Sequence, residues 1–163
     1  MRTTDSVTVT TVVEIDPATA FKVFTEETAV WWKPGPQSRF GGDLTGALRF
    51  EQGPGGRLLE ASDAAAGEPF EVGRVLVWEP PDRLVFEWRL RSFLPGERTE
   101  VEVRFEEVPE GTRVTVEHRG WDSLRADHPA RFGYTGLAFA DIVGLWWADL
   151  LVSIKSRARS YNN

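Results

Sequence analysis

Apolar and polar residues alternate along much of the chain between residues 45 and 119, and glycine or proline interrupts the alternation at intervals. Residues 83–91 and 99–108 show the pattern most clearly, with an apolar side chain at every second position over most of their length. Turn-forming residues separate such segments at 52–56, 80–82 and 109–111. Strands joined by short turns pair in antiparallel fashion, so the pattern predicts an antiparallel sheet with one face on a core.

One long apolar helix is expected to follow the strands. Within residues 135–160 apolar side chains recur every three or four positions, among them Leu137, Trp146 and Ile154. A helix with such a stripe must pack it against the sheet. The other expected elements, in chain order, are a strand at 6–14, a helix beginning at Asp16-Pro17, a short helix at 26–32, and strands at 45–51, 57–61, 70–79, 83–91, 99–108 and 112–119.

Composition limits the class of protein. The chain has 163 residues, enough for a single domain over 1–163 with its own core. It contains no cysteine, which excludes disulfides, thiol nucleophiles and thiolate metal sites. The formal net charge of −6 argues against nucleic acid as a partner. Neither a signal peptide nor a membrane span is recognisable, so we expect a soluble, cytoplasmic protein.

Tryptophan is unusually frequent, with seven residues that include the adjacent pairs Trp31-Trp32 and Trp146-Trp147. Large rings with one polar N–H group line cavities as readily as they fill cores. Neighbours on a helix diverge by about 100°, so one member of each pair is expected to face inward. The surplus of rings predicts an apolar pocket, and plain core packing is the alternative.

Four stretches of the sequence match one family pattern, at residues 20–32, 73–84, 99–105 and 111–121. On these motifs the chain resembles the START-like (SRPBCC) superfamily, in the branch similar to activators of the heat-shock-protein-90 ATPase. The resemblance implies an α+β helix-grip fold of the START/Bet v 1 type, in which a curved antiparallel sheet wraps around a long C-terminal helix in the order β-α-α-β6-α. It also implies an elongated cavity between sheet and helix, where members of the wider superfamily bind lipids, hormones or polyketides.

Several residues are predicted to line this cavity, because they fall on inward-facing positions or at its mouth. They are Trp32, Arg74, Trp78, Phe86, Trp88, Phe105, His118, Leu137, Trp146 and Asp149.

The two histidines are expected in different environments. His118 alternates with Val114 and Val116, which points its imidazole toward the cavity. There it could orient a ligand or act as an acid or base, and a hydrogen-bonded structural histidine is the alternative. His128 precedes a proline in a predicted loop, so we expect it at the surface.

Two charged residues are candidates for the same cavity. Arg74 has the strand parity of Leu76 and Trp78, which would turn its guanidinium inward, toward a carboxylate of the ligand or of the protein. Glu60 and Asp149 are the candidate protein partners, and an internal salt bridge or an exposed position at the cavity mouth is the alternative. Asp149 falls on the helix face that should look at the sheet.

Motifs of standard enzyme chemistry are absent from the sequence. Two histidines ten residues apart, without cysteine, disfavour a metal site, and no nucleophile elbow, phosphate loop or dinucleotide motif occurs. We therefore expect no catalytic residue, metal or cofactor, and a protein that binds a hydrophobic or aromatic small molecule. Two alternatives stay open. One is co-chaperone-like regulation of a chaperone protein, which the resemblance implies, and the other is a polyketide cyclase or hydrolase that uses His118 as acid or base and Arg74 to hold a carbonyl or carboxylate.

Overall fold

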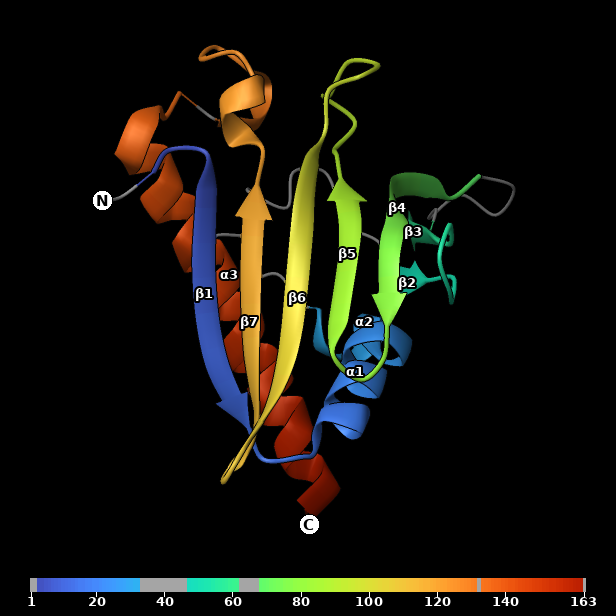
Figure 1. The fold of residues 1–163 in the computed structure, drawn as a ribbon. Helices are drawn as coiled ribbons and strands as arrows, with labels where there is room; N and C mark the ends of the chain where they lie inside the picture. Colours follow the sequence, from blue (N-terminus) through green and yellow to red (C-terminus); the bar gives the residue numbers. More distant parts are fainter. Residues whose placement is uncertain (1–2, 33–46, 62–67, 132, 163) are drawn as a thin grey trace.

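Seven antiparallel strands form one sheet in the computed structural model, which describes residues 3–32, 47–61, 68–131 and 133–162 (Figure 1). The strand order is β1-β7-β6-β5-β4-β3-β2, so the N-terminal strand pairs with the last strand of the chain. The strands are β1 (Ser6–Val13), β2 (Leu48–Phe50), β3 (Arg57–Glu60), β4 (Phe70–Glu79), β5 (Arg83–Trp88), β6 (Thr99–Val108) and β7 (Gly111–Arg119).

The helices all pack on one side of this sheet. The first begins where the sequence predicts, because the carboxylate of Asp16 accepts the backbone N–H of Thr19 at 2.8 Å. The C-terminal helix crosses behind β1 and β7 (Figure 1). At Gly144 it comes so close to β1 that a Cβ would lie 3.3 Å from the side chain of Val7. The helices are α1 (Pro17–Glu26), α2 (Thr28–Trp31) and α3 (Gly136–Arg159), with short 3-10 turns η2 (Trp121–Ser123), η3 (Pro129–Arg131) and η4 (Ser160–Asn162).

The predicted α+β helix-grip architecture and its element order are confirmed. The strands expected at 70–79 and 99–108 have the predicted bounds. The strand expected at 83–91 ends at Trp88, since the chain then turns and the N–H of Phe93 donates to the carbonyl of Leu90. The first two residues of the strand expected at 45–51 lie outside the described residues.

A bulge in β4 overturns the predicted orientation of Arg74. Val75 pairs with Phe86, and Trp78 pairs with Leu84, but the register shifts between Val75 and Val77. Val75 and Trp78 therefore both face the interior, although they are an odd number of positions apart. The expectation that Arg74 shares a face with Trp78 was wrong. Arg74 is exposed on the outer face, where its Nε lies 3.4 Å from the Glu71 carboxylate.

One carboxylate organises the outer face of the sheet. Glu102 lies on the outer face, yet it is buried because three arginines cover it. Arg83 lies 2.8 Å from its carboxylate, and Arg104 and Arg119 each lie 2.7 Å away. Burial alone would raise the pKa of Glu102, but the three guanidinium groups outweigh it and hold the pKa at about 2. This ionic cluster joins β5, β6 and β7 from outside.

The C-terminal helix and η4 together, residues 136–162, are long and apolar enough to cross a membrane by length and composition. Within the described part of the chain this is the one helix of which that is true. Its apolar residues pack on the inner face of the sheet, and Trp147, Leu150 and Ile154 are buried there. It is therefore the core helix of a soluble fold.

Candidate functional site

Four tryptophan side chains meet between the sheet and α3, and we call them the tryptophan cluster. Trp32 follows α2, Trp88 ends β5, and Trp146 and Trp147 lie on α3. The rings of Trp32 and Trp88 stack with centroids 5.6 Å apart and planes 19° apart. The edge of Trp147 meets Trp32 at 5.4 Å, and Trp146 lies 5.4 Å from Trp88. The rings thus pack against one another in the space between sheet and helix where the sequence places a ligand.

The expectation that one ring of each tryptophan pair faces inward was wrong for the pair on α3. Trp146 and Trp147 are both buried, and so is Trp31, whereas Trp32 is half-buried. The reason is that α3 is covered from two sides, by the sheet and by α2. The hydroxyl of Ser153 on α3 donates to the carbonyl of Trp31 at 2.5 Å, which fixes this second contact.

The predicted wall residues Trp78, Phe86 and Phe105 belong to an aromatic group around α1, which ring contacts through Phe24 and Trp31 join to the tryptophan cluster. Trp78 and Phe105 each lie 5.2 Å from the ring of Phe21. Phe86 packs edge-on against Phe50 at 5.2 Å. These residues face the interior as predicted, but they form a packed core below the tryptophan cluster.

Two other predicted wall residues lie apart from both groups. Leu137 is 43% exposed in the first turn of α3. Asp149 is half-buried on the same helix. Glu60, the other candidate partner of Arg74, is buried with Arg91 at 2.6 Å, and it pairs across the strands with Phe70 whereas Arg74 lies opposite Arg57.

A chain of hydrogen bonds fixes His118 beside the tryptophan cluster. The indole N–H of Trp147 can only donate, and it lies 3.0 Å from Nδ1 of His118. Nε2 of His118 lies 2.7 Å from Oγ1 of Thr99. The Thr99 hydroxyl donates its one hydrogen to the carbonyl of Trp88 at 3.0 Å, so it must accept from His118. The imidazole is therefore neutral, with its hydrogen on Nε2.

This arrangement leaves His118 without a free nitrogen. Its side chain is fully buried, and burial lowers the pKa of His118 to about 3. An acid or base at neutral pH needs a pKa near the working pH and an open path to the reacting atom. The predicted alternative of a hydrogen-bonded structural histidine is the one that the geometry supports.

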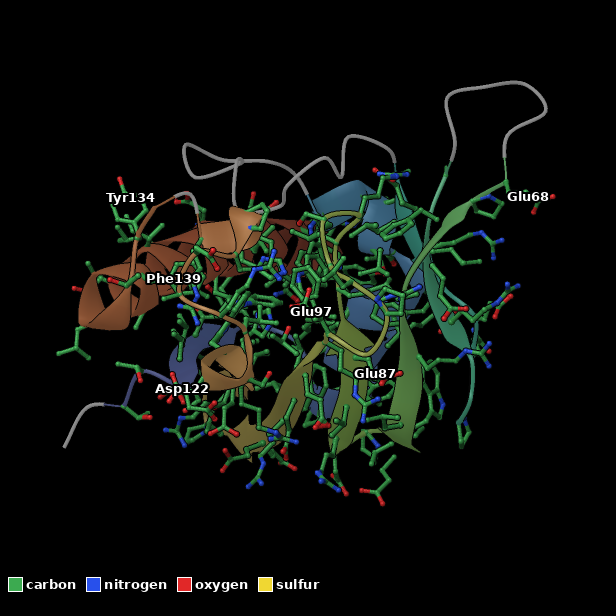
Figure 2. The ribbon with its side chains drawn as sticks, turned by 90° about the horizontal axis from the view of Figure 1, so that it is seen from above. Glu68, Glu87, Glu97, Asp122, Tyr134 and Phe139 are labelled. Atoms are coloured by element: carbon green, nitrogen blue, oxygen red, sulfur yellow. The ribbon has the colours of Figure 1, made fainter. Side chains whose placement is uncertain are left out.

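His128 is buried, which overturns its expected place at the surface. It is 1% exposed, and its Nε2 lies 2.9 Å from the carboxylate of Glu97. Its ring meets the edge of Phe93 at 4.8 Å. The segment between β7 and α3 folds onto the β5–β6 connection. A loop pattern in the sequence does not predict such a contact between distant segments. Figure 2 views this end of the molecule from above, with Glu97 and Phe139 labelled.

Two buried donors beside His118 have no hydrogen-bond partner among the described residues. They are the indole N–H groups of Trp88 and Trp121. The Trp121 ring lies 4.6 Å from the His118 ring and 5.0 Å from Phe139. Gly120, at a φ of 96°, makes the turn after β7 that brings Trp121 back over the interior. An unsatisfied N–H group cannot be predicted from a sequence.

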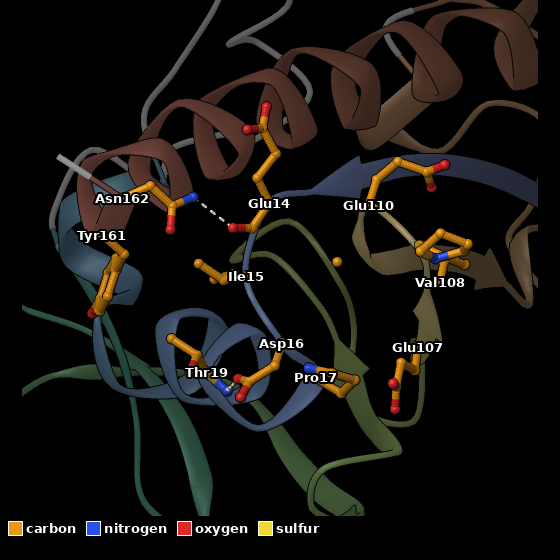
Figure 3. A pocket seen from close by; sticks show the side chains of 12 residues that line it. Glu14, Ile15, Asp16, Pro17, Thr19, Glu107, Val108, Glu110, Tyr161 and Asn162 are labelled. Carbon is orange, nitrogen blue, oxygen red and sulfur yellow. Dashed lines mark hydrogen bonds between the residues drawn. The ribbon is translucent and has the colours of Figure 1, made fainter.

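An open hollow of about 680 Å³ lies at the opposite end of the sheet (Figure 3). It is formed by the β6–β7 turn, the β1–α1 junction and η4, and it shares no residue with the predicted wall. Its lining includes the carboxylates of Glu14, Asp16, Glu107 and Glu110. Asp16 is the cap of α1, and the side chain of Asn162 donates to the carbonyl of Glu14 at 2.6 Å. The first bond caps α1 and the second joins η4 to the end of β1.

The fold defines a helix-grip protein, and comparison with known families agrees. Residues 14–138 match the model of a family described as Activator of Hsp90 ATPase homolog 1-like protein. The chain therefore belongs to this family. A search of curated proteins found no significant match.

Solved structures share the fold at low sequence identity. Protein NE0264 from Nitrosomonas europaea is 14% identical, with a TM-score of 0.67 and 99% of both chains covered. Protein MLL2253 from Mesorhizobium loti is 18% identical, with a TM-score of 0.62, 97% of this chain and 98% of that one. DynU16, described as a putative protein in the dynemicin biosynthetic locus, is 20% identical, with a TM-score of 0.59, 93% of this chain and 46% of its own. At such identities the likeness establishes the fold alone.

Replacing Thr99 tests the hydrogen-bond chain. Thr99→Val keeps the shape of the side chain but removes the hydroxyl, so the buried N–H of His118 loses its acceptor and the carbonyl of Trp88 loses one donor. We expect a loss of about 1–3 kcal/mol in the free energy of unfolding. Thr99→Ser keeps the hydroxyl and loses only a methyl group, so it should cost less. Urea denaturation of both variants measures the difference, and a valine variant as stable as the serine variant would contradict the assignment.

The buried neutral His118 predicts a pH dependence of stability. The folded pKa of about 3 lies below the unfolded value of 6.5, so only the unfolded chain binds a proton between these values. The contribution of neutral His118 to the free energy of unfolding is complete above pH 6.5. It is lost as the pH falls, and the slope of the free energy of unfolding against pH approaches about 1.4 kcal/mol per pH unit. Between pH 6.5 and 5 the slope should be smaller in His118→Gln. Carboxylates such as Glu102 lower the free energy of unfolding only below about pH 4.5, where they bind protons in the unfolded chain. Equal slopes for variant and wild type in urea titrations would refute the prediction.

Proposed function

We propose that the protein binds a hydrophobic or aromatic small molecule between the sheet and α3, against the face of Trp88, without catalysing a reaction. The position of Trp32 is the observation that supports this. Its ring is half-buried, yet it lies flat on Trp88, which is wholly buried. A planar ligand could replace the Trp32 ring and make the same contact with Trp88.

The chain around Trp32 suits such an exchange. Trp31 anchors the segment, because its indole N–H donates to the carbonyl of Val23 at 3.1 Å. Trp32 follows a helix of only four residues, and ring contacts hold its side chain. A short helix depends on tertiary packing for its stability. Trp32 could therefore swing away while Trp31 stays in place.

Two further observations favour binding over catalysis. Both nitrogens of His118 are engaged within the protein, and Arg74 lies on the outer face, so neither residue named for a cyclase reaction is free to act in the interior. DynU16 has this fold and is described from a biosynthetic locus, a setting in which a protein meets small molecules.

Removing the Trp32 ring tests the proposal. The stack that a ligand must displace contributes about 0.5–1.5 kcal/mol, so Trp32→Ala should bind a planar aromatic probe roughly two- to tenfold more tightly. The probe is anilinonaphthalene sulfonate, and its fluorescence on titration gives the dissociation constant. Trp78→Ala is the matched control, because Trp78 is also half-buried but packs on Phe21.

The control should leave probe affinity unchanged. Weaker binding by Trp32→Ala than by the wild type would show that Trp32 is a wall and not a displaceable ring. Absence of binding by both proteins, shown to be folded by circular dichroism, would contradict small-molecule binding and leave chaperone regulation as the stronger alternative.

A further inference from the structure

The ring of Trp32 lies among the rings of four other tryptophans, and we call the space that it fills between them the tryptophan box. It stacks on Trp88 with centroids 5.6 Å apart, and it lies 5.2 Å from Trp31. Trp146 and Trp147 meet it at steep angles of 70° and 76°, with centroids 6.2 and 5.4 Å away. The four surrounding residues are between 0% and 3% exposed, whereas Trp32 is half-buried. The box therefore has buried aromatic walls and one side that is open to solvent.

Hydrogen bonds and strand pairing hold three of the walls independently of the central ring. The indole N–H of Trp31 donates to the carbonyl of Val23 at 3.1 Å, and that of Trp147 donates to Nδ1 of His118 at 3.0 Å. Trp88 is the last residue of β5, a strand that pairs with β4 on one side and β6 on the other. When the central ring swings out, the space that it leaves has the dimensions of one indole, which is a system of two fused rings.

Trp146 is the fourth wall, and it closes one side of the box. Its ring contacts both members of the stack, at 6.2 Å from Trp32 and 5.4 Å from Trp88, and its plane is inclined to theirs by 70° and 55°. It therefore stands beside the stack, across the plane in which the ring of a ligand would lie. Trp147 supports it from the same helix, at 5.1 Å. A packed wall resists an added ring, because overpacking forces side chains out of their preferred rotamers.

We propose that the tryptophan box selects its ligand by the number of fused rings, and that it takes a planar aromatic skeleton of two rings with any charged group at the open side. This inference rests on the proposed function and names the class of ligand. The two rings replace the indole of Trp32 and gain their affinity from buried apolar surface. A third ring has no room inside and extends through the open side into water, where it adds little. A charged group stays at the open side because burial would remove its hydration.

Three aromatic sulfonates with one, two and three linearly fused rings test the inference. Benzenesulfonate, naphthalenesulfonate and anthracenesulfonate carry the same charge, so they differ in ring number alone. Each is titrated against the wild type loaded with anilinonaphthalene sulfonate, and displacement of the dye gives its dissociation constant. The second ring should tighten binding by about tenfold, because its surface is buried. The third ring should change the affinity by less than about twofold.

Trp146→Leu removes the wall that stops the third ring. In this variant anthracenesulfonate should bind about five- to tenfold more tightly than naphthalenesulfonate. Trp121→Leu is the matched control, because Trp121 is buried to the same extent, at 4% exposed against 3%, and its ring lies against His118 and Phe139. The control should keep the wild-type ratio of the two affinities. Circular dichroism shows whether each variant is folded, and the wild-type series decides the limit of two rings even if Trp146→Leu does not fold.

The outcomes separate this inference from the proposed function. A third ring that tightens binding to the wild type by about tenfold, or a second ring that does not tighten it, would overturn the limit of two rings and leave small-molecule binding intact. A folded Trp146→Leu that still gains nothing from the third ring would overturn the role of Trp146 as the wall. Failure of the dye and of all three sulfonates to bind would overturn the proposed function, and the limit of two rings with it.

Discussion

The hydrogen-bond chain from Trp147 through His118 and Thr99 to the carbonyl of Trp88 ties the long helix to the inner face of the sheet. It joins α3 to β7, β6 and β5, and each of its members is buried. Because every donor in the chain has one acceptor, the imidazole has a single protonation state and a single orientation. The rings of Trp88, Trp121, Trp146 and Trp147 pack around the imidazole of His118.

The same chain explains why His118 is not placed for acid–base chemistry. A histidine whose two nitrogens both serve the fold has none left for a substrate. Beside His118 lie the indole N–H groups of Trp88 and Trp121, for which the described residues offer no acceptor. These features belong to the residues of this chain, whereas the similar solved structures establish only the fold.

Much of the fold could be predicted from the sequence, because alternation and turn residues are local signals. The strands at 70–79 and 99–108 and the cap of α1 at Asp16 follow from such signals. The side-chain environments depend on distant parts of the chain and could not be predicted in the same way. The bulge in β4 reverses Arg74, arginines from neighbouring strands bury Glu102, and a returning segment buries His128.

The protonation state of His118 is the most direct measurement of this account, and nitrogen-15 NMR of the imidazole reports it. At neutral pH the account predicts a neutral ring with its hydrogen on Nε2, a hydrogen bond received at Nδ1, and no titration between pH 7 and 5. A hydrogen on Nδ1, or conversion to the imidazolium near pH 6 while the protein stays folded, would contradict it. Either result would mean that His118 is free to meet a ligand or substrate.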